Sequence, residues 1–194
     1  MIARMPLARI GLALLLGAAA PLHAQDGAGA SSAILLQLAP APRPLALGGA
    51  YAALAQDPYA LFYNPGRLAG TPRAFGAAYH AYPVGVAAGS AAATVPFGRF
   101  ALALGVHYLD LGEVEVLEPD PAYGGQRGRP TGEVADGGEV LAAVGGALAV
   151  GPSLRVGAAA KALRLGLAGA TDQGFAADVG ASVALFRGRL QLAA

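Results

Sequence analysis

Along most of the chain after residue 73, apolar residues alternate with small or polar residues. They do so in runs of about ten residues that are separated by turn residues. Successive side chains of a β-strand point to opposite faces, so this period of two predicts strands. We expect seven of them, at 74–82, 85–95, 99–109, 138–150, 154–165, 174–185 and from Arg189 onward.

The predicted strands have one apolar face and one that carries the charge. Arg155 and Lys161 share a face of the 154–165 strand, and Val156, Ala158, Ala160 and Ala162 share the other. In the 174–185 strand, Asp178 and Phe175 are on opposite faces. In the 99–109 strand, Phe100 and Tyr108 bracket three aliphatic side chains on one face. Soluble β-sandwiches alternate too, but their strands are usually shorter, about 5 or 6 residues. The pattern favours membrane strands with an aromatic residue near each end of a lipid-facing band.

The connections between the predicted strands alternate in length. Those at 96–98, 151–153 and 186–188 are tight, whereas 110–136 and 166–173 are long, and only the connection at Pro83-Val84 breaks the alternation. Outer-membrane barrels have short periplasmic turns and longer external loops. The chain therefore has the layout of such a barrel.

The N-terminus has the pattern of a secretory signal peptide. Arg4 and Arg9 precede an uncharged run at 10–20, and Pro21 and the small residue Ala24 lie before an expected cleavage after Ala24. The run is too short to cross a bilayer as a helix. We expect export by this signal peptide (1–24), then an N-terminal segment (25–72) and the strands of a barrel (73–194).

The N-terminal segment contains several local structure signals. Residues 33–38 predict a short strand, and Gly48 and Gly49 are expected to open a helix that runs through Ala55. Asp57-Pro58 and Asn64-Pro65 each predict a helix start, because the polar side chain accepts a backbone N–H and proline suits the first helical position.

Composition sharpens this prediction. Of the 194 residues, 55% are hydrophobic and 13% charged, and the net charge of +1 gives no basic surface for nucleic acid. The absence of cysteine excludes disulfides, thiolate nucleophiles and cysteine-ligated metals. A mean hydropathy of +0.50 without a transmembrane helix pattern is typical of a β-barrel that meets lipid with one face.

The stretch from Arg43 to Ala69 resembles the N-terminal signature of the PorV/PorQ family of outer-membrane β-barrels, which share their architecture with FadL-like proteins. The chain departs from this signature at Pro65-Gly66-Arg67-Leu68, where the family has Pro-Ala-Gly-Leu. The glycine is therefore shifted by one position, and an arginine enters the segment. The positions that match the signature are Gly48, Gly49, Ala50, Tyr51, Ala53, Asp57, Asn64, Pro65, Leu68 and Ala69, with Pro58 after the aspartate.

The resemblance implies an all-β fold: an antiparallel transmembrane β-barrel with a short N-terminal helical hatch inside. With about 7–8 strands present, we expect a truncated, partial barrel, or else a small eight-stranded barrel that uses 33–38 as its eighth strand. The implied partners are outer-membrane lipid and either hydrophobic small molecules, moved passively, or secretion-system proteins of type IX secretion. The alternatives are an anchored interaction protein without transport and, much less favoured, an outer-membrane hydrolase.

The polar residues of the strands give no pattern for an enzyme, a cofactor or a metal site. His80, His107, Ser90, Ser182 and Asp178 lack a nucleophile motif, and no third ligand is spaced to join the two histidines. Eight of the twelve acidic residues fall in 110–139, which predicts a solvated loop with a divalent-cation site as the alternative. We expect the lumen-facing residues to be His80, His107, Arg155, Lys161 and Asp178.

Lys161 and Asp178 give the most local prediction. A hairpin that turns at Gly169-Ala170 places the two side chains directly opposite each other on the inward face. The alternative is that both are hydrated in the lumen without contact.

Overall fold

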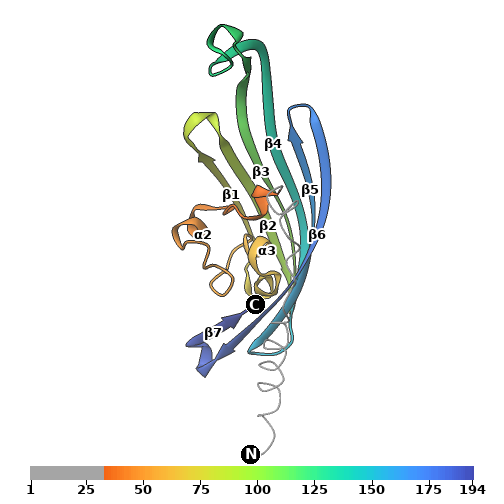
Figure 1. Ribbon diagram of the computed structural model, residues 1–194. Helices are drawn as coiled ribbons and strands as arrows, with labels where there is room; N and C mark the ends of the chain where they lie inside the picture. Colours follow the sequence, from red (N-terminus) through yellow and green to blue (C-terminus); the bar gives the residue numbers. More distant parts are fainter. Residues whose placement is uncertain (1–32) are drawn as a thin grey trace, which may run out of the picture.

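The computed structural model describes residues 33–194, so the predicted signal peptide lies outside the described residues. Seven strands form one antiparallel sheet in which each strand pairs with its sequence neighbours (Figure 1). The strands are β1 (Ala74–Ala81), β2 (Ala87–Phe97), β3 (Phe100–Pro119), β4 (Gly128–Ala149), β5 (Leu154–Leu167), β6 (Ala170–Leu185) and β7 (Leu190–Ala193). All seven predicted strands are present, with shifted ends.

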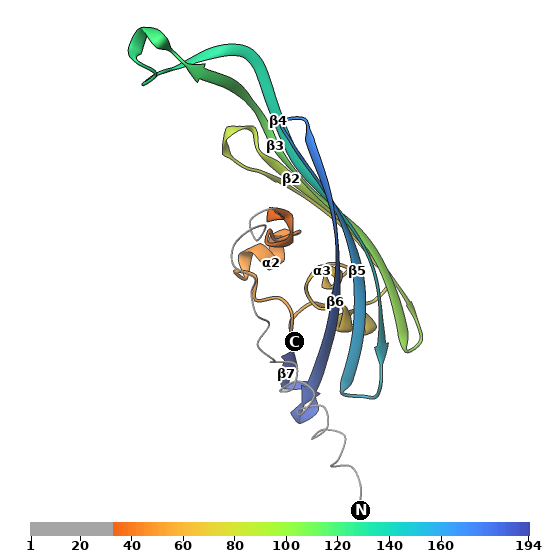
Figure 2. The same ribbon diagram turned by 45° about the vertical axis from the view of Figure 1, so that its right-hand side comes forward.

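The sheet curls into half of a barrel, and the N-terminal segment lies against its concave face (Figures 1 and 2). This segment contains short helices only. They are η1 (Ile34–Leu36), α2 (Pro42–Ala46), α3 (Ala60–Tyr63) and η2 (Pro65–Gly70). Three further 3-10 turns connect strands or close the hairpin tip: η3 (Pro83–Gly85), η4 (Pro121–Tyr123) and η5 (Phe186–Gly188).

Two predictions for the N-terminal segment are wrong. Residues 33–38 do not form a strand, because Glu139 accepts the backbone N–H groups of Ile34 and Leu35 and holds them as the start of η1. The eight-stranded alternative therefore fails for this part of the chain. Gly48 and Gly49 do not open a helix but follow α2, where their positive φ angles suit a helix end.

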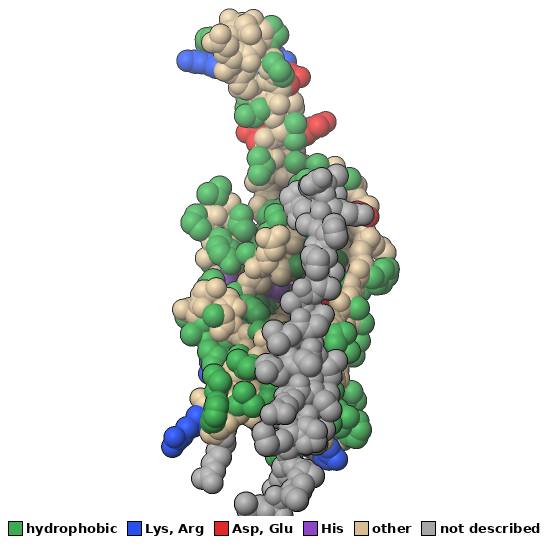
Figure 3. Space-filling model, turned by 60° about the horizontal axis from the view of Figure 1, so that its bottom comes forward, with side chains coloured by type: hydrophobic (Ala, Val, Ile, Leu, Met, Phe, Trp, Pro, Cys, Tyr) green, Lys and Arg blue, Asp and Glu red, His purple; other side chains and the backbone are tan. Residues whose placement is uncertain are grey.

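Both predicted long loops are also wrong, because the strands continue through them. β3 and β4 run past their neighbours and pair on to Pro119 and Gly128, which makes a two-stranded extension that we call the ribbon (residues 111–136). β5 and β6 continue to a tight turn at Ala168 and Gly169, both with positive φ. Two such residues are what a two-residue hairpin turn requires. In Figure 3 the acidic side chains gather toward the ribbon, at the top of the view.

The convex face of β1–β6 is apolar throughout its middle. Every outward position in 75–81, 87–97, 100–108, 140–148, 154–162 and 175–183 is apolar or glycine. The large exposed side chains on this face are Phe75, Tyr79, Phe97, Phe100, Leu102, Leu104, Val106, Tyr108, Val140, Val144, Phe175 and Val179. The predicted division between an apolar face and a face with charges is confirmed.

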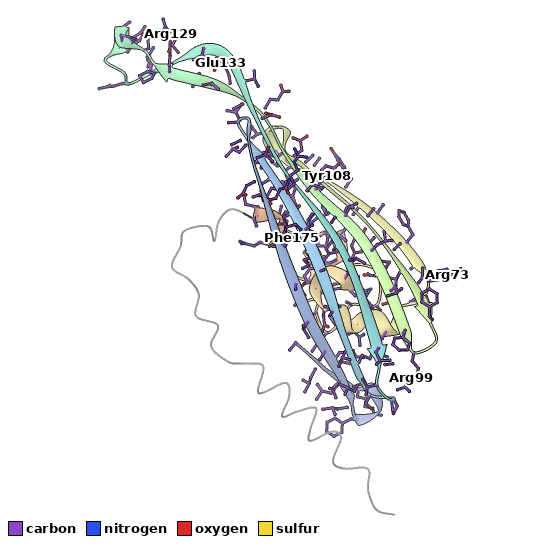
Figure 4. All side chains as sticks on the ribbon, turned by 90° about the vertical axis from the view of Figure 1, so that its right-hand side faces the viewer. Arg73, Arg99, Tyr108, Arg129, Glu133 and Phe175 are labelled. Carbon is purple, nitrogen blue, oxygen red and sulfur yellow. The ribbon has the colours of Figure 1, made fainter. Side chains whose placement is uncertain are left out.

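Four aromatic side chains on the convex face lie toward the two ends of the apolar band, whereas Phe75 and Phe175 lie between them in the register of the sheet. Phe97 pairs with Phe100 next to the short β2–β3 turn, whereas Tyr79 and Tyr108 both flank Gly89 farther along the strands. In Figure 4, Arg73 and Arg99 lie toward the end with this turn, and Arg129 and Glu133 lie beyond the opposite end, on the ribbon. No helix within residues 33–194 is long and apolar enough to cross a membrane.

Candidate functional site: the covered concave face

Polar side chains occupy inward positions on six successive strands. The register of the sheet puts all of them on the face that the N-terminal segment covers. From β1 to β6 in order they include His80, Ser90, His107, Glu139, Lys161 and Asp178, and the same face also holds Thr94 and Ser182. The strands thus bring together four of the five predicted lumen-facing residues, with Arg155 nearer the end of the same face.

Lys161 and Asp178 form an ion pair on the concave face. Lys161 Nζ lies 2.5 Å from Asp178 Oδ2, and the lysine side chain is only 8% exposed. The ammonium also donates a 3.4 Å hydrogen bond to the carbonyl of Phe62 in α3. The predicted contact and its direction are confirmed, so the hydrated, separated alternative is wrong.

The predicted register of this hairpin is wrong by two residues. Lys161 stands opposite Ala176, and Asp178 stands opposite Ala159. The turn lies at Ala168-Gly169 rather than Gly169-Ala170, so the charged side chains meet diagonally across the two strands. A shift of two preserves which face each side chain occupies, whereas a shift of one would have reversed it.

His107 is one of the most enclosed polar groups of the wall. It is 2% exposed, and the Phe62 ring meets its edge with 6.2 Å between centroids. Its Nε2 has no hydrogen-bond partner within residues 33–194, and the same holds for Nε2 of His80, whose ring stacks on Tyr82. Buried polar atoms without partners are rare in proteins. These two buried atoms therefore leave hydrogen-bonding capacity unused on the concave face.

Of the residues in the hydrolase alternative, Ser90 stands directly opposite His107 on the concave face, whereas Ser182 stands opposite Arg155. Ser90 donates its hydroxyl hydrogen bond to the carbonyl of Pro40, which ties β2 to the N-terminal segment. The described residues contain no group of three or more histidine, aspartate or glutamate side chains placed to hold a metal ion. The acidic residues at 113–136 lie on the exposed ribbon, where Glu118 pairs with Arg129.

Glu139 belongs to this site and was not predicted from the sequence. Its carboxylate is buried and accepts the N–H groups of Ile34 at 3.2 Å and Leu35 at 2.8 Å. The only signal for it in the sequence is a carboxylate at an inward position of a strand whose next inward residues are Leu141 and Ala143. Its partners lie more than a hundred residues away, so no local pattern shows them.

A cavity of about 150 Å³ separates the N-terminal segment from the wall. Its lining is mostly aliphatic and aromatic, with polar side chains from the wall and with Gln37 from the N-terminal segment. The lining includes Leu35, Leu38, Phe62, Leu141, His107 and Lys161. This is the composition of a small-molecule site, which is largely apolar with a few polar groups that fix orientation.

Tyr51 and Asp57 of the predicted hatch motif bond to each other. The Tyr51 hydroxyl donates to Asp57 Oδ2, and the other carboxylate oxygen accepts the N–H of Tyr59 at 3.0 Å, just before α3. Tyr51 also meets the Tyr63 ring edge-on, with 5.4 Å between centroids. Burial and the neighbouring carboxylate raise the pKa of Tyr51 above its ordinary value. Gly48 and Gly49 lie outside this contact, at the end of α2, and Pro58 follows the aspartate.

Asn64 and Pro65 attach the other end of the segment to the wall. Asn64 Oδ1 accepts the Gly66 N–H at 2.9 Å, and its Nδ2 donates to the carbonyl of Ala181 at 3.0 Å. A Cβ atom on Gly157 of β5 would lie 2.6 Å from the Pro65 carbonyl oxygen, so a side chain there would prevent this approach. The motif residues therefore dock η2 directly on the backbone of β5 and β6.

No family model matches the chain, and no curated protein matches it either. The resemblance to the PorV/PorQ family stays a prediction from the residues that carry it.

Proposed function

We propose that this protein is an outer-membrane β-barrel protein. Its sheet forms part of the barrel wall, and its N-terminal segment lies in the lumen. The observation that carries the proposal is the convex face, where every outward position across the middle of β1–β6 is apolar or glycine. Exposed apolar area on this scale marks a surface that meets lipid or another apolar partner. The charged side chains of the same strands lie on the opposite face or at their ends.

The dimensions of the apolar band support contact with a bilayer. From Phe100 to Tyr108, β3 covers nine residues, which extend roughly 27–30 Å along the strand. With the usual strand tilt, this spans an apolar band of about 25 Å. Aromatic side chains near both ends of the band match the girdles that such proteins place at the two interfaces.

As its activity we propose a passive route for hydrophobic small molecules past the N-terminal segment. The cavity beside η1 and α3 supports this activity, because its apolar lining and its two polar wall residues suit a small ligand with one polar group. The residues that hold the segment in place, Glu139, Ser90 and Lys161, all bond to its backbone.

Two experiments test the proposal. In the first, the exported chain should fractionate with the outer membrane and give a β-rich circular dichroism spectrum in detergent; recovery as a soluble periplasmic monomer would refute the membrane placement. In the second, vesicles that contain the protein should take up a hydrophobic fluorescent probe faster than empty vesicles. Equal uptake rates would refute the transport activity and leave the membrane placement intact.

A second candidate function is an accessory role in protein secretion, and the ribbon favours it. Residues 111–136 carry six acidic and two basic side chains, and both edges of the ribbon are unpaired beyond β2 and β5. Free strand edges offer backbone hydrogen bonds to an extended partner. If a ribbon shortened to a tight turn leaves probe uptake unchanged but stops export of a secreted reporter, the accessory role is supported over transport.

A further inference from the structure

Two arginines lie at the end of the concave face that is nearer the short β4–β5 turn. Arg67 of η2 is 2% exposed, and its Nε–H donates to the carbonyl of Ala55 at 2.9 Å. The two ion pairs of residues 33–194 are Glu118–Arg129 and Lys161–Asp178, so no described carboxylate neutralises Arg67. A buried charge without a counterion is costly, and most buried arginines are paired.

Arg155 brings a second positive charge to the same helix. It begins the inward row of β5, opposite Ser182, and its guanidinium folds over the end of η2. A Cβ atom on Gly70 would lie 2.8 Å from its Cζ atom and 2.9 Å from Nη1. Burial and the charge of Arg155 both lower the pKa of Arg67. The two guanidinium groups therefore repel each other across η2.

The neighbouring carboxylates are already engaged elsewhere. Asp57 accepts from Tyr51 and from the backbone of Tyr59, and Asp178 pairs with Lys161. Asp178 also stands four residues along β6 from Ser182, the partner of Arg155, which is roughly 13 Å of strand. Within the described residues, no carboxylate forms an ion pair with Arg67 or Arg155.

We propose that Arg67 and Arg155 form a binding site for an oxyanion, a phosphate or carboxylate group that the protein takes up from solution or as the head group of a small amphipathic molecule. The planar guanidinium fork matches both groups and binds them with two parallel hydrogen bonds. The buried Ser182 hydroxyl adds a neutral polar group beside Arg155. This inference does not depend on membrane placement, which the fractionation experiment tests separately.

The experiment measures phosphate binding to the full chain folded in detergent micelles. Calorimetry and thermal unfolding compare inorganic phosphate, acetate and hexyl phosphate with chloride at constant ionic strength. We expect phosphate or acetate to bind and to raise the unfolding temperature, whereas chloride does not. Tighter binding of hexyl phosphate than of phosphate indicates a head group as the natural ligand, and equal binding indicates a free anion. If none of the oxyanions stabilises the protein more than chloride, the proposal is wrong.

Variants locate the site. Arg155→Gln should weaken binding of the oxyanion at least about tenfold, as the loss of a charge-assisted bond predicts. Arg164→Gln removes the same charge from the exposed convex face of β5 and should leave binding within about twofold. Gly70→Ala keeps both charges but pushes the Arg155 guanidinium aside, so it should also weaken binding. Equal affinities in Arg155→Gln and Arg164→Gln would overturn the site even if Arg67 variants fail to fold.

Discussion

The two faces of the same sheet differ completely in chemistry although they alternate residue by residue. The convex face is apolar across its middle, while the concave face carries His80, His107, Glu139, Lys161 and Asp178. The N-terminal segment lies against the concave face and supplies backbone partners to two of these residues, Glu139 and Lys161. This contrast between the two faces is the observation that supports our proposal of a lipid-facing convex face.

The wall and the ribbon differ in the same way along single strands. In the wall, β3 and β4 are apolar except for the inward His107 and Glu139, whereas past Asp110 and Gly137 they carry acidic side chains and are largely exposed on both faces. The change occurs where their neighbours β2 and β5 stop pairing with them. The strands therefore change composition at the point where the apolar band ends.

The largest effect is expected from a charge on the convex face. Leu104→Arg places a guanidinium at the middle of the apolar band and should destabilise the protein folded in vesicles by roughly 2–4 kcal/mol. Val134→Arg on the ribbon is the matched control and should cost less than about 0.5 kcal/mol. Urea unfolding in phospholipid vesicles measures both. Equal costs at the two positions would remove the distinction between wall and ribbon.

A smaller effect is expected on the concave face from Lys161→Met. The change leaves Asp178 without its partner and the Phe62 carbonyl without a donor, so unfolding should become easier by roughly 1–3 kcal/mol. When Asp178→Asn is combined with Lys161→Met, part of the lost stability should be recovered, because the unpaired carboxylate is removed. Urea unfolding of the two single variants and the double variant measures the coupling. If the double variant costs the sum of the singles, the two side chains do not interact.

The smallest effect is local and concerns the attachment of η1. Glu139→Gln replaces a carboxylate that accepts two N–H groups by an amide, which should weaken the attachment by about 1 kcal/mol. Hydrogen exchange at the amides of Ile34 and Leu35 should become about fivefold faster. Glu133→Gln on the exposed ribbon is the control and should leave both exchange rates unchanged. Unchanged rates in Glu139→Gln would show that other contacts hold η1.

The sequence was sufficient where a property depends on period two and insufficient where it depends on distant partners. The face of each strand residue follows from alternation, so the inward direction of Lys161 and Asp178 was predictable. The register of the two strands was not predictable, because the observed turn, Ala168-Gly169, lies one residue before the predicted turn. The conformation of 33–38 depends on Glu139, and the burial of Arg67 depends on Ala55 and the wall, so neither is visible in a local pattern.

The prediction of a long loop at 110–136 was wrong for a different reason. Its acidic residues and prolines are typical of a loop, but β3 and β4 already run side by side there, so pairing simply continues. Two register shifts, at Asp110/Glu113 and Glu115/Leu117, accommodate residues that interrupt the alternation.

The central claim, that the convex face meets lipid, is tested most directly by tryptophan fluorescence. The chain contains no tryptophan, so Leu104→Trp or Val134→Trp reports a single position. Each variant is folded into vesicles whose lipids carry bromine in the middle of the acyl chains, a quencher that acts only at short range. Our account predicts strong quenching and blue-shifted emission for Leu104→Trp and neither effect for Val134→Trp on the ribbon. Unquenched, water-exposed emission from Leu104→Trp in the folded protein would contradict it.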